Sequence, residues 1–207
     1  MDDLQRVAGE IRAVGARVVA DRCDVTHPAA VRAFVDRACA AFGAVDVAVN
    51  NAVYRGEAEN LGFLEQPDAE WRRNMEVNLE GPCNVCRAVL PVMKARQWGR
   101  IISFSGATAL LGAGVSKAVV RMGIVGMTRG IAREFGPYNI TANCIAPSTI
   151  ETERDGASPR KGVRASQPIQ RLGRPQEVVA LIVYLASENA GFITGQCYPI
   201  NGGSYFL

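Results

Sequence analysis

The chain has 207 residues, is 48% hydrophobic and carries a formal net charge of +3 at pH 7. This length and composition suffice for one substantial hydrophobic core, so we expect a single domain over residues 1–207. Lys and Arg are scattered along helical faces, which argues against nucleic acid or a membrane as a partner. The chain opens with Met1-Asp2-Asp3 and has no apolar run of about 18 residues, so we expect a soluble, cytoplasmic protein.

Six cysteines at irregular spacing are typical of a reducing compartment rather than of a disulfide framework. Cys83 and Cys86 form a CxxC, but no second Cys or His pair completes a zinc site, so no metal is expected. His27 is the single histidine of the sequence, which excludes a histidine-based triad elsewhere on the chain.

The first elements alternate between helix and strand. Residues 2–14 predict an amphipathic helix, and Arg17–Ala20 a short strand. A second helix follows and ends near Gly43. Val45–Asn50 predicts a strand that is nearly all apolar, hence buried on both faces, and that carries Asn50-Asn51-Ala52 to its end.

A loop over residues 53–67 leads into a long helical region from Trp71 to Trp98. Residues 99–147 then predict a βαβ unit: a buried strand, a Gly-rich turn, a helix and a second buried strand. Ser105, Lys117 and Arg121 lie in its turn and helix. Chemistry is expected there, because parallel sheets bind ligands at the ends of their strands.

Residues 148–167 are polar, without clear periodicity, and predict a lid over a site. Pro175 begins the last helix, and Gly195–Ile200 predicts a final strand. Strands that alternate with helices throughout indicate an α/β fold, with a parallel sheet covered on both faces.

Several motifs, in this order and spacing, resemble the short-chain dehydrogenase/reductase family over nearly the whole chain. They are Asp24-Val25-Thr26, Asn50-Asn51-Ala52, MEVNLEG around Asn78, GRIISFSG, GMTRGIAREFG, ITANCIAP, RLGRPQEV, YLASENAGFITGQ and the closing INGG.

The resemblance implies a Rossmann-like, doubly wound parallel sheet that binds NAD or NADP. It also implies hydride transfer between an alcohol and a ketone of a small-molecule substrate, and a homo-oligomer, either a dimer or a tetramer. Seven positions match the family's cofactor contacts: Asp24 and Val25 beside the adenine, Asn50 and Ala52 near the ribose and phosphates, and Pro147, Ile150 and Thr152 at the nicotinamide end.

The N-terminal part of the family pattern is missing. The family begins with a strand, a T-G-x-x-x-G-x-G turn, a helix and a second strand, and this chain starts after them. We therefore expect an N-terminally truncated fold without the usual phosphate cradle, arising from a truncated reading frame of a longer enzyme or from a natural short form. The Gly-rich turn at residues 106–114 is a substitute cradle or, as favoured, a flexible turn beside the substrate.

The family's catalytic set also differs here. It comprises an Asn, a Ser and Y-x-x-x-K, of which the Asn matches Asn78. Local identity places Ala113 at the tyrosine position. Spacing to GMTRGIAREFG places Lys117 there and Arg121 at the lysine position, and we prefer this register because an insertion inside a packed helix would rotate all later residues. Neither register supplies a tyrosine.

The family serine falls at Ser105 or, counted strictly along the strand, at Gly106. Lys117 and Arg121 are four residues apart and share a helix face, so two cations would point at one spot. Three interpretations of Lys117 stay open: a general acid/base, part of an anion site, or part of a solvated basic face. Three hypotheses follow: an oxidoreductase with altered catalysis, a non-catalytic homologue acting as an interaction partner, and a small-anion binder.

Overall fold

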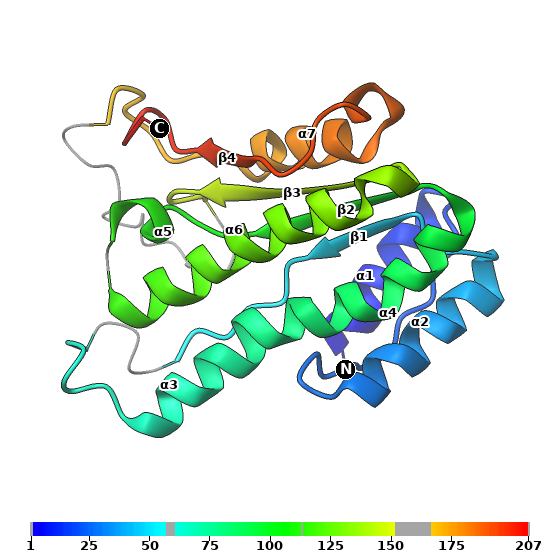
Figure 1. Cartoon of the computed structure of the whole chain (residues 1–207), viewed down its shortest axis with the longest axis horizontal. Helices are drawn as coiled ribbons and strands as arrows, with labels where there is room; N and C mark the ends of the chain where they lie inside the picture. The colour runs from blue at the N-terminus through cyan, green and yellow to red at the C-terminus, as the bar shows by residue number, and fades with distance from the viewer. Residues whose placement is uncertain (1, 57–60, 113, 152–166, 207) are drawn as a thin grey trace.

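The computed structural model describes residues 2–56, 61–112, 114–151 and 167–206, and their strands form one four-stranded parallel sheet in the order β1-β2-β3-β4 (Figure 1). The strands are β1 (Val47–Asn50), β2 (Gly99–Phe104), β3 (Ile140–Pro147) and β4 (Cys197–Ile200). Every neighbouring pair is parallel, so each connection crosses over through helical structure. The predicted βαβ unit is confirmed.

The helices follow the predicted order. They are α1 (Asp2–Ala13), α2 (Pro28–Phe42), α3 (Asp68–Met75), the π-helical segment η2 (Glu76–Glu80), α4 (Gly81–Arg96), α5 (Thr108–Leu111), α6 (Val115–Phe135) and α7 (Pro175–Ala186), with short 3₁₀ turns η3 (Gly136–Tyr138) and η5 (Glu188–Ala190). Proline stands in the first turn of α2 and α7, where its missing N–H costs no helical hydrogen bond. Gly43 ends α2 in the left-handed conformation.

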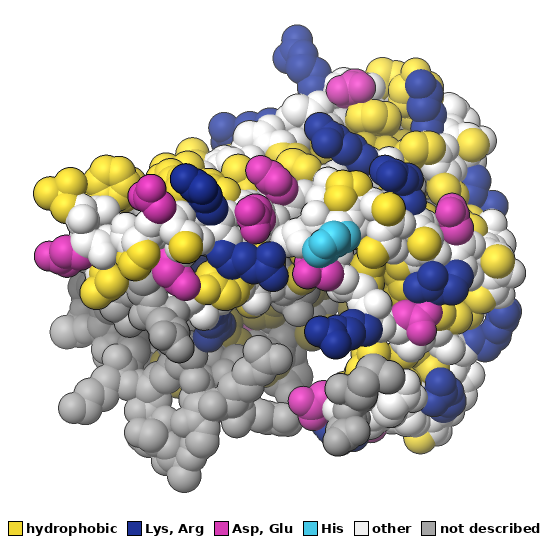
Figure 2. Space-filling model, turned by 90° about the horizontal axis from the view of Figure 1, so that it is seen from below, with side chains coloured by type: hydrophobic (Ala, Val, Ile, Leu, Met, Phe, Trp, Pro, Cys, Tyr) yellow, Lys and Arg dark blue, Asp and Glu magenta, His cyan; other side chains and the backbone are white. Residues whose placement is uncertain are grey.

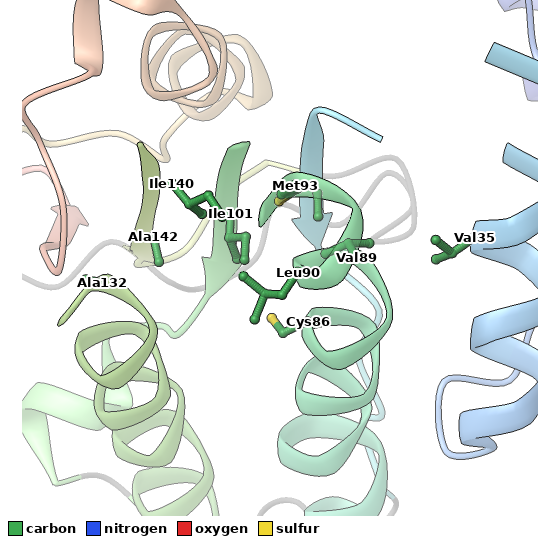
Figure 3. Close-up of a cluster of buried hydrophobic side chains, with 10 residues drawn as sticks. Val35, Cys86, Val89, Leu90, Met93, Ile101, Ala132, Ile140 and Ala142 are labelled. Atoms are coloured by element: carbon green, nitrogen blue, oxygen red, sulfur yellow. The ribbon is translucent and has the colours of Figure 1, made fainter. Parts of the chain in front are cut away.

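One face of the sheet packs against α4 and α6. Its core cluster joins Met93, Ile101 and Ile140, all at most 2% exposed, to residues of α2, α4 and α6 (Figure 3). The other face packs against α7, where Ile102 and Ile145 meet Val178 and Leu185. Adjacent residues of β2 thus point to opposite faces of the sheet, because side chains alternate between the two faces along a strand. The sheet is doubly wound.

The strand predicted at Arg17–Ala20 is wrong. The structure assigns no strand to residues 16–24, and within the described chain β1 pairs with β2 alone. A strand needs a neighbour for its backbone hydrogen bonds, and no described strand lies beside these residues.

The prediction that the strand ending at Asn50 is buried on both faces is also wrong. Ala48 and Asn50 are buried, whereas Val47 and Val49 are 36% and 42% exposed. α4 packs on one face of β1. On the opposite face of the sheet α7 lies over β2, so the side chains of the two valines stay exposed to solvent. The helix predicted at residues 2–14 is confirmed as α1, although the structure buries its Ala8 and leaves Val7 exposed.

Charges of both signs are interspersed on the face that carries His27, with hydrophobic side chains between them (Figure 2). Such a surface lacks the single-sign field that nucleic acid attracts. Among the described residues, no helix combines the length and the apolar character that crossing a membrane demands.

Candidate active site

A cavity of about 550 Å³ opens at the carboxyl ends of β1, β2 and β3. Its walls come from the strand ends at residues 49–56, 104–105, 147–148 and 150, from α3 and η2, from α6 and from α7. Ligand pockets commonly measure about 300–1,000 Å³. The cavity lies where open α/β sheets bind their ligands, because the loops diverge at this edge.

Eight of the eleven predicted site residues line this cavity: Asn50, Ala52, Asn78, Ser105, Lys117, Arg121, Pro147 and Ile150. Asp24 and Val25 are not among its lining residues. Thr152 lies outside the described residues. Segments that are far apart in sequence therefore meet at one place, although the two residues predicted at the adenine lie elsewhere.

Asn78 sits on the π-helical segment η2, between α3 and α4. Its amide nitrogen donates to the carbonyl of Tyr54 at 2.8 Å and to Oδ1 of Asn74 at 2.6 Å, and its oxygen accepts from the Tyr54 N–H at 2.7 Å. π-bulges within helices frequently occur at functional sites. Here Asn78 fixes the loop after β1 against the helix and so shapes one wall of the cavity.

Ser105 is fully buried at the end of β2, and its hydroxyl donates to the backbone carbonyl of Arg121 at 3.1 Å. In return the Arg121 guanidinium donates to the Ser105 carbonyl. The next residue, Gly106, has a φ of +120°, and a Cβ there would meet the guanidinium. The turn after β2 thus holds Arg121 in place. It needs glycine at residue 106 because φ is positive there and because a side chain would meet the guanidinium.

Lys117 precedes Arg121 by one turn of α6, and both line the cavity. The stem of Lys117 passes over Gly114, at 3.5 Å from the position of a Cβ on that glycine. The alternative register would use Ala113, which lies outside the described residues. Two cationic side chains on one helix face therefore reach the cavity, as their spacing predicts.

Asp24 caps a turn instead of facing the cavity. Its Oδ1 accepts from the N–H and the hydroxyl of Thr26, and these hydrogen bonds, the backbone one foremost, lower the pKa of Asp24. The carbonyl of Val25 accepts from Asn84 on α4 at 3.0 Å. Val25 also lies against Gly81, where a Cβ would come within 2.6 Å of its side chain.

Sequence reasoning missed Tyr54 and Glu70, which line the same cavity. The Tyr54 hydroxyl donates to Glu70 Oε1 at 2.9 Å, and the Arg73 guanidinium lies 6.0 Å from the centre of the tyrosine ring. Tyr54 could have been predicted as a site residue, because it lies only four residues after Asn50, just beyond the end of a strand. Glu70 carried none, because nothing in its local pattern separates it from a solvent-facing residue in the first turn of a helix.

The two cysteines of the CxxC in α4 lie in surroundings that favour the protonated thiol. Asn50 donates to the Cys86 sulfur at 3.6 Å, and burial raises the pKa of Cys86 to about 12. Burial also raises the pKa of Cys83. Both thiols stay protonated near neutral pH and are poor nucleophiles.

Comparison with known proteins gives the family of this chain. The family model described as enoyl-(acyl carrier protein) reductase matches residues 1–205. The 3-oxoacyl-[acyl-carrier-protein] reductase of Escherichia coli K12 is 34% identical over 189 residues, which cover 89% of this chain and 76% of that protein. The chain belongs to the short-chain dehydrogenase/reductase family.

Other members of the family align over still more of the chain. The BbsD subunit of (2S)-[(R)-hydroxy(phenyl)methyl]succinyl-CoA dehydrogenase from Thauera aromatica is 34% identical over 98% of this chain and 82% of its own length. A crystal structure of a 3-oxoacyl-[acyl-carrier protein] reductase with bound NAD, from Brucella melitensis, superposes with a TM-score of 0.86 at 32% identity. It covers 100% of this chain and 79% of that one. The prediction of the family from its motifs is confirmed.

Proposed function

We propose that this short-chain dehydrogenase/reductase interconverts a ketone and an alcohol with NAD or NADP, and that Lys117 holds the proton that moves. The observation that carries the proposal is the position of Lys117 and Arg121. Both line the cavity at the strand ends, together with the loop after β1 and the start of the segment after β3. A proton donor and a fixed cation at one point are what carbonyl reduction requires of the protein.

The residues of the cavity fit the nicotinamide half of the cofactor. Three parallel strands end there, and residues 50–52, 147–148 and 150 line it. A relative whose structure contains NAD shares the fold at a TM-score of 0.86. The bound cofactor would supply or accept the hydride. Asn50, Ala52, Pro147 and Ile150 are the residues proposed to hold it, with Asp24 and Val25 toward its adenine end.

In the reduction, the ammonium of Lys117 gives its proton to the carbonyl oxygen of the substrate as that oxygen gains negative charge. Arg121, held by the carbonyl of Ser105, presents a fixed positive charge to the same region. Fixed charges lower the barrier because they need no rearrangement as the oxyanion develops. Ser105 acts through this contact, since its buried hydroxyl is bonded to the carbonyl of Arg121.

The first substrates to assay are 3-oxoacyl thioesters, the class named for several relatives. The cavity suits an acyl chain, because apolar side chains from four segments of the chain line it: Val53, Phe104, Ile150, Val178, Val179 and Ile182. Such a wall recovers free energy when it removes apolar surface from water.

Turnover of NADH or NADPH with a short 3-oxoacyl thioester tests the proposal. Wild-type protein should consume one of the two nucleotides, and Lys117→Ala should lower kcat by at least about 100-fold, the scale of general acid catalysis. Arg133→Ala is the matched control, because Arg133 is an exposed cation on the same helix outside the cavity. A Lys117→Ala variant of full activity would remove Lys117 from the mechanism. A folded wild type that binds neither nucleotide would mark a non-catalytic homologue.

We also propose a homo-oligomer, either a dimer or a tetramer. α6 and α7 expose large apolar side chains, among them Val119, Met122, Val183 and Tyr184. Light scattering coupled to size exclusion gives the mass in solution; a monomeric mass at all concentrations would contradict the proposal.

A cytoplasmic location is proposed on the state of the cysteines. All six are free, including the buried Cys86 and Cys144. Free thiols in this number are typical of a reducing compartment. Fractionation of the native host, with this protein followed by antibody, would place it.

A further inference from the structure

Two cysteines stand side by side on neighbouring strands. Cys144 on β3 is directly in register with Cys197 on β4. Both pack against the cluster formed by Ile124 and Val125 of α6, so the two side chains leave the sheet on the same face. Neighbouring strands lie about 4.7–4.9 Å apart, and disulfides span Cα separations of about 4.4–6.8 Å. The backbone therefore already has the spacing that a disulfide needs.

The two thiols differ in their exposure to solvent and in how readily each loses its proton. Cys144 is completely buried, whereas Cys197 is partly exposed. The Cys144 thiol donates a hydrogen bond to the Cys197 sulfur, which raises the pKa of Cys144 and lowers that of Cys197. The charge of Arg129 also lowers the pKa of Cys197, against the effect of its burial. The more accessible sulfur is thus the one favoured as a thiolate, and the thiolate is the reactive form.

A metal site does not explain the pair. Within the described ranges, no group of three or more His, Cys, Asp and Glu side chains is placed to hold a metal ion. The catalytic proposal uses neither sulfur, and neither cysteine lines the cavity. The pairing thus calls for an explanation of its own.

We propose that Cys144 and Cys197 form a reversible disulfide when the protein meets a hydroperoxide. The thiolate of Cys197 attacks one peroxide oxygen and becomes a sulfenic acid. The O–O bond breaks, and the other peroxide oxygen takes up a proton and leaves as water or an alcohol. The thiol of Cys144 then attacks the sulfenic sulfur, forms the S–S bond, and releases its proton and the hydroxyl as water. One peroxide is reduced by two electrons, and two thiols are oxidised by two electrons.

The bond would close the chain from residue 144 to residue 197. That span contains Pro147, Ile150 and α7, which contribute to the lining of the cavity. A cross-link at the base of the span fixes β4 to β3 and stabilises the fold by limiting the unfolded chain. Oxidation is therefore expected to raise Tm.

The test is a peptide map of the reduced, full-length protein after treatment with hydrogen peroxide. Trypsin places Cys144 in the peptide 134–154 and Cys197 in the peptide 172–207, and neither peptide contains another cysteine. We expect these two peptides linked, with two of the six thiols lost and all six regained after dithiothreitol. Cys197→Ser should abolish the link and the rise in Tm. Cys23→Ser, a matched change at another partly exposed cysteine, should change neither.

Other results would overturn the proposal. A link within the peptide 74–87 would assign the oxidation to Cys83 and Cys86 instead. Retention of both thiols in 134–154 and 172–207, or irreversible oxidation of Cys197 alone, would show that the pair does not close. The map needs only the wild type, so it decides the question even if a cysteine variant fails to fold.

Discussion

Asn78 and the backbone of Tyr54 exchange two hydrogen bonds, 2.8 Å from the amide nitrogen to the carbonyl oxygen and 2.7 Å from the N–H to the side-chain oxygen. This exchange joins the π-helical segment to the loop after β1. Asn78 therefore positions a wall of the cavity, beyond its match to a family motif.

Replacing Asn78 tests this positioning. Asn78→Leu leaves the N–H and carbonyl of Tyr54 without these partners, so we expect a loss of about 1–3 kcal/mol in the free energy of unfolding. Urea denaturation measures it, and KM for the substrate should rise as the loop loosens. Glu80→Gln, an exposed change in the same segment, is the control and should leave both quantities unchanged. Equal stabilities of Asn78→Leu and wild type would refute the positioning role.

Gly106→Ala tests the contact between Gly106 and Arg121. The φ of residue 106 is +120°, which strains an alanine, and the new Cβ would meet the Arg121 guanidinium. We therefore expect about 1–3 kcal/mol of destabilisation and a displaced Arg121. Gly126→Ala is the matched control on α6, because a Cβ there meets nothing within 4 Å. This control should stabilise the helix by about 0.5–1 kcal/mol. If both variants shift stability in the same direction, the account of the turn is wrong.

The start of α7 predicts a pH dependence. Arg171 holds both carboxylate oxygens of Glu177, at 2.8 and 2.6 Å, and the Arg174 N–H donates to the same group at 2.7 Å. These contacts, the hydrogen bonds from Arg171 foremost, lower the pKa of Glu177 to about 2. A carboxyl whose pKa falls on folding stabilises the protein above its unfolded pKa, and that stabilisation is lost as the pH falls toward the folded pKa.

Glu177→Gln should therefore have a lower Tm than wild type at pH 6 to 7, and the difference should shrink between about pH 4.5 and 2. Thermal melts across this range measure it. Because the group is exposed, added salt should weaken the effect. A Tm difference that does not change with pH would show that Glu177 acts through packing rather than through its charge.

The sequence was enough to predict the elements that carry their own pattern. β2 and β3 are apolar runs, α6 follows from its helical periodicity, and the Gly-rich turn between them separates the strand from the helix. The meeting of Asn50, Asn78 and Lys117 at one cavity followed from family motifs and from the rule that parallel strands end at the same edge.

What could not be predicted depends on neighbours that lie far away in the sequence. Arg17–Ala20 has the composition of a strand, yet a strand forms only beside a partner, and the described chain provides none there. The exposure of Val47 and Val49 depends on where α7 crosses the sheet. The Tyr54–Glu70 contact joins a loop to a helix sixteen residues later, and no local pattern specifies that approach.

The most direct test of the central claim follows nucleotide binding and turnover in the same preparation. Melting of the purified chain with NADH and with NADPH should show a saturable rise in Tm for at least one of them. That nucleotide should then be consumed with a 3-oxoacyl thioester, at a rate that falls at least about 100-fold in Lys117→Ala while the rise in Tm remains. A folded protein whose Tm responds to neither nucleotide, and which consumes neither, would contradict the account.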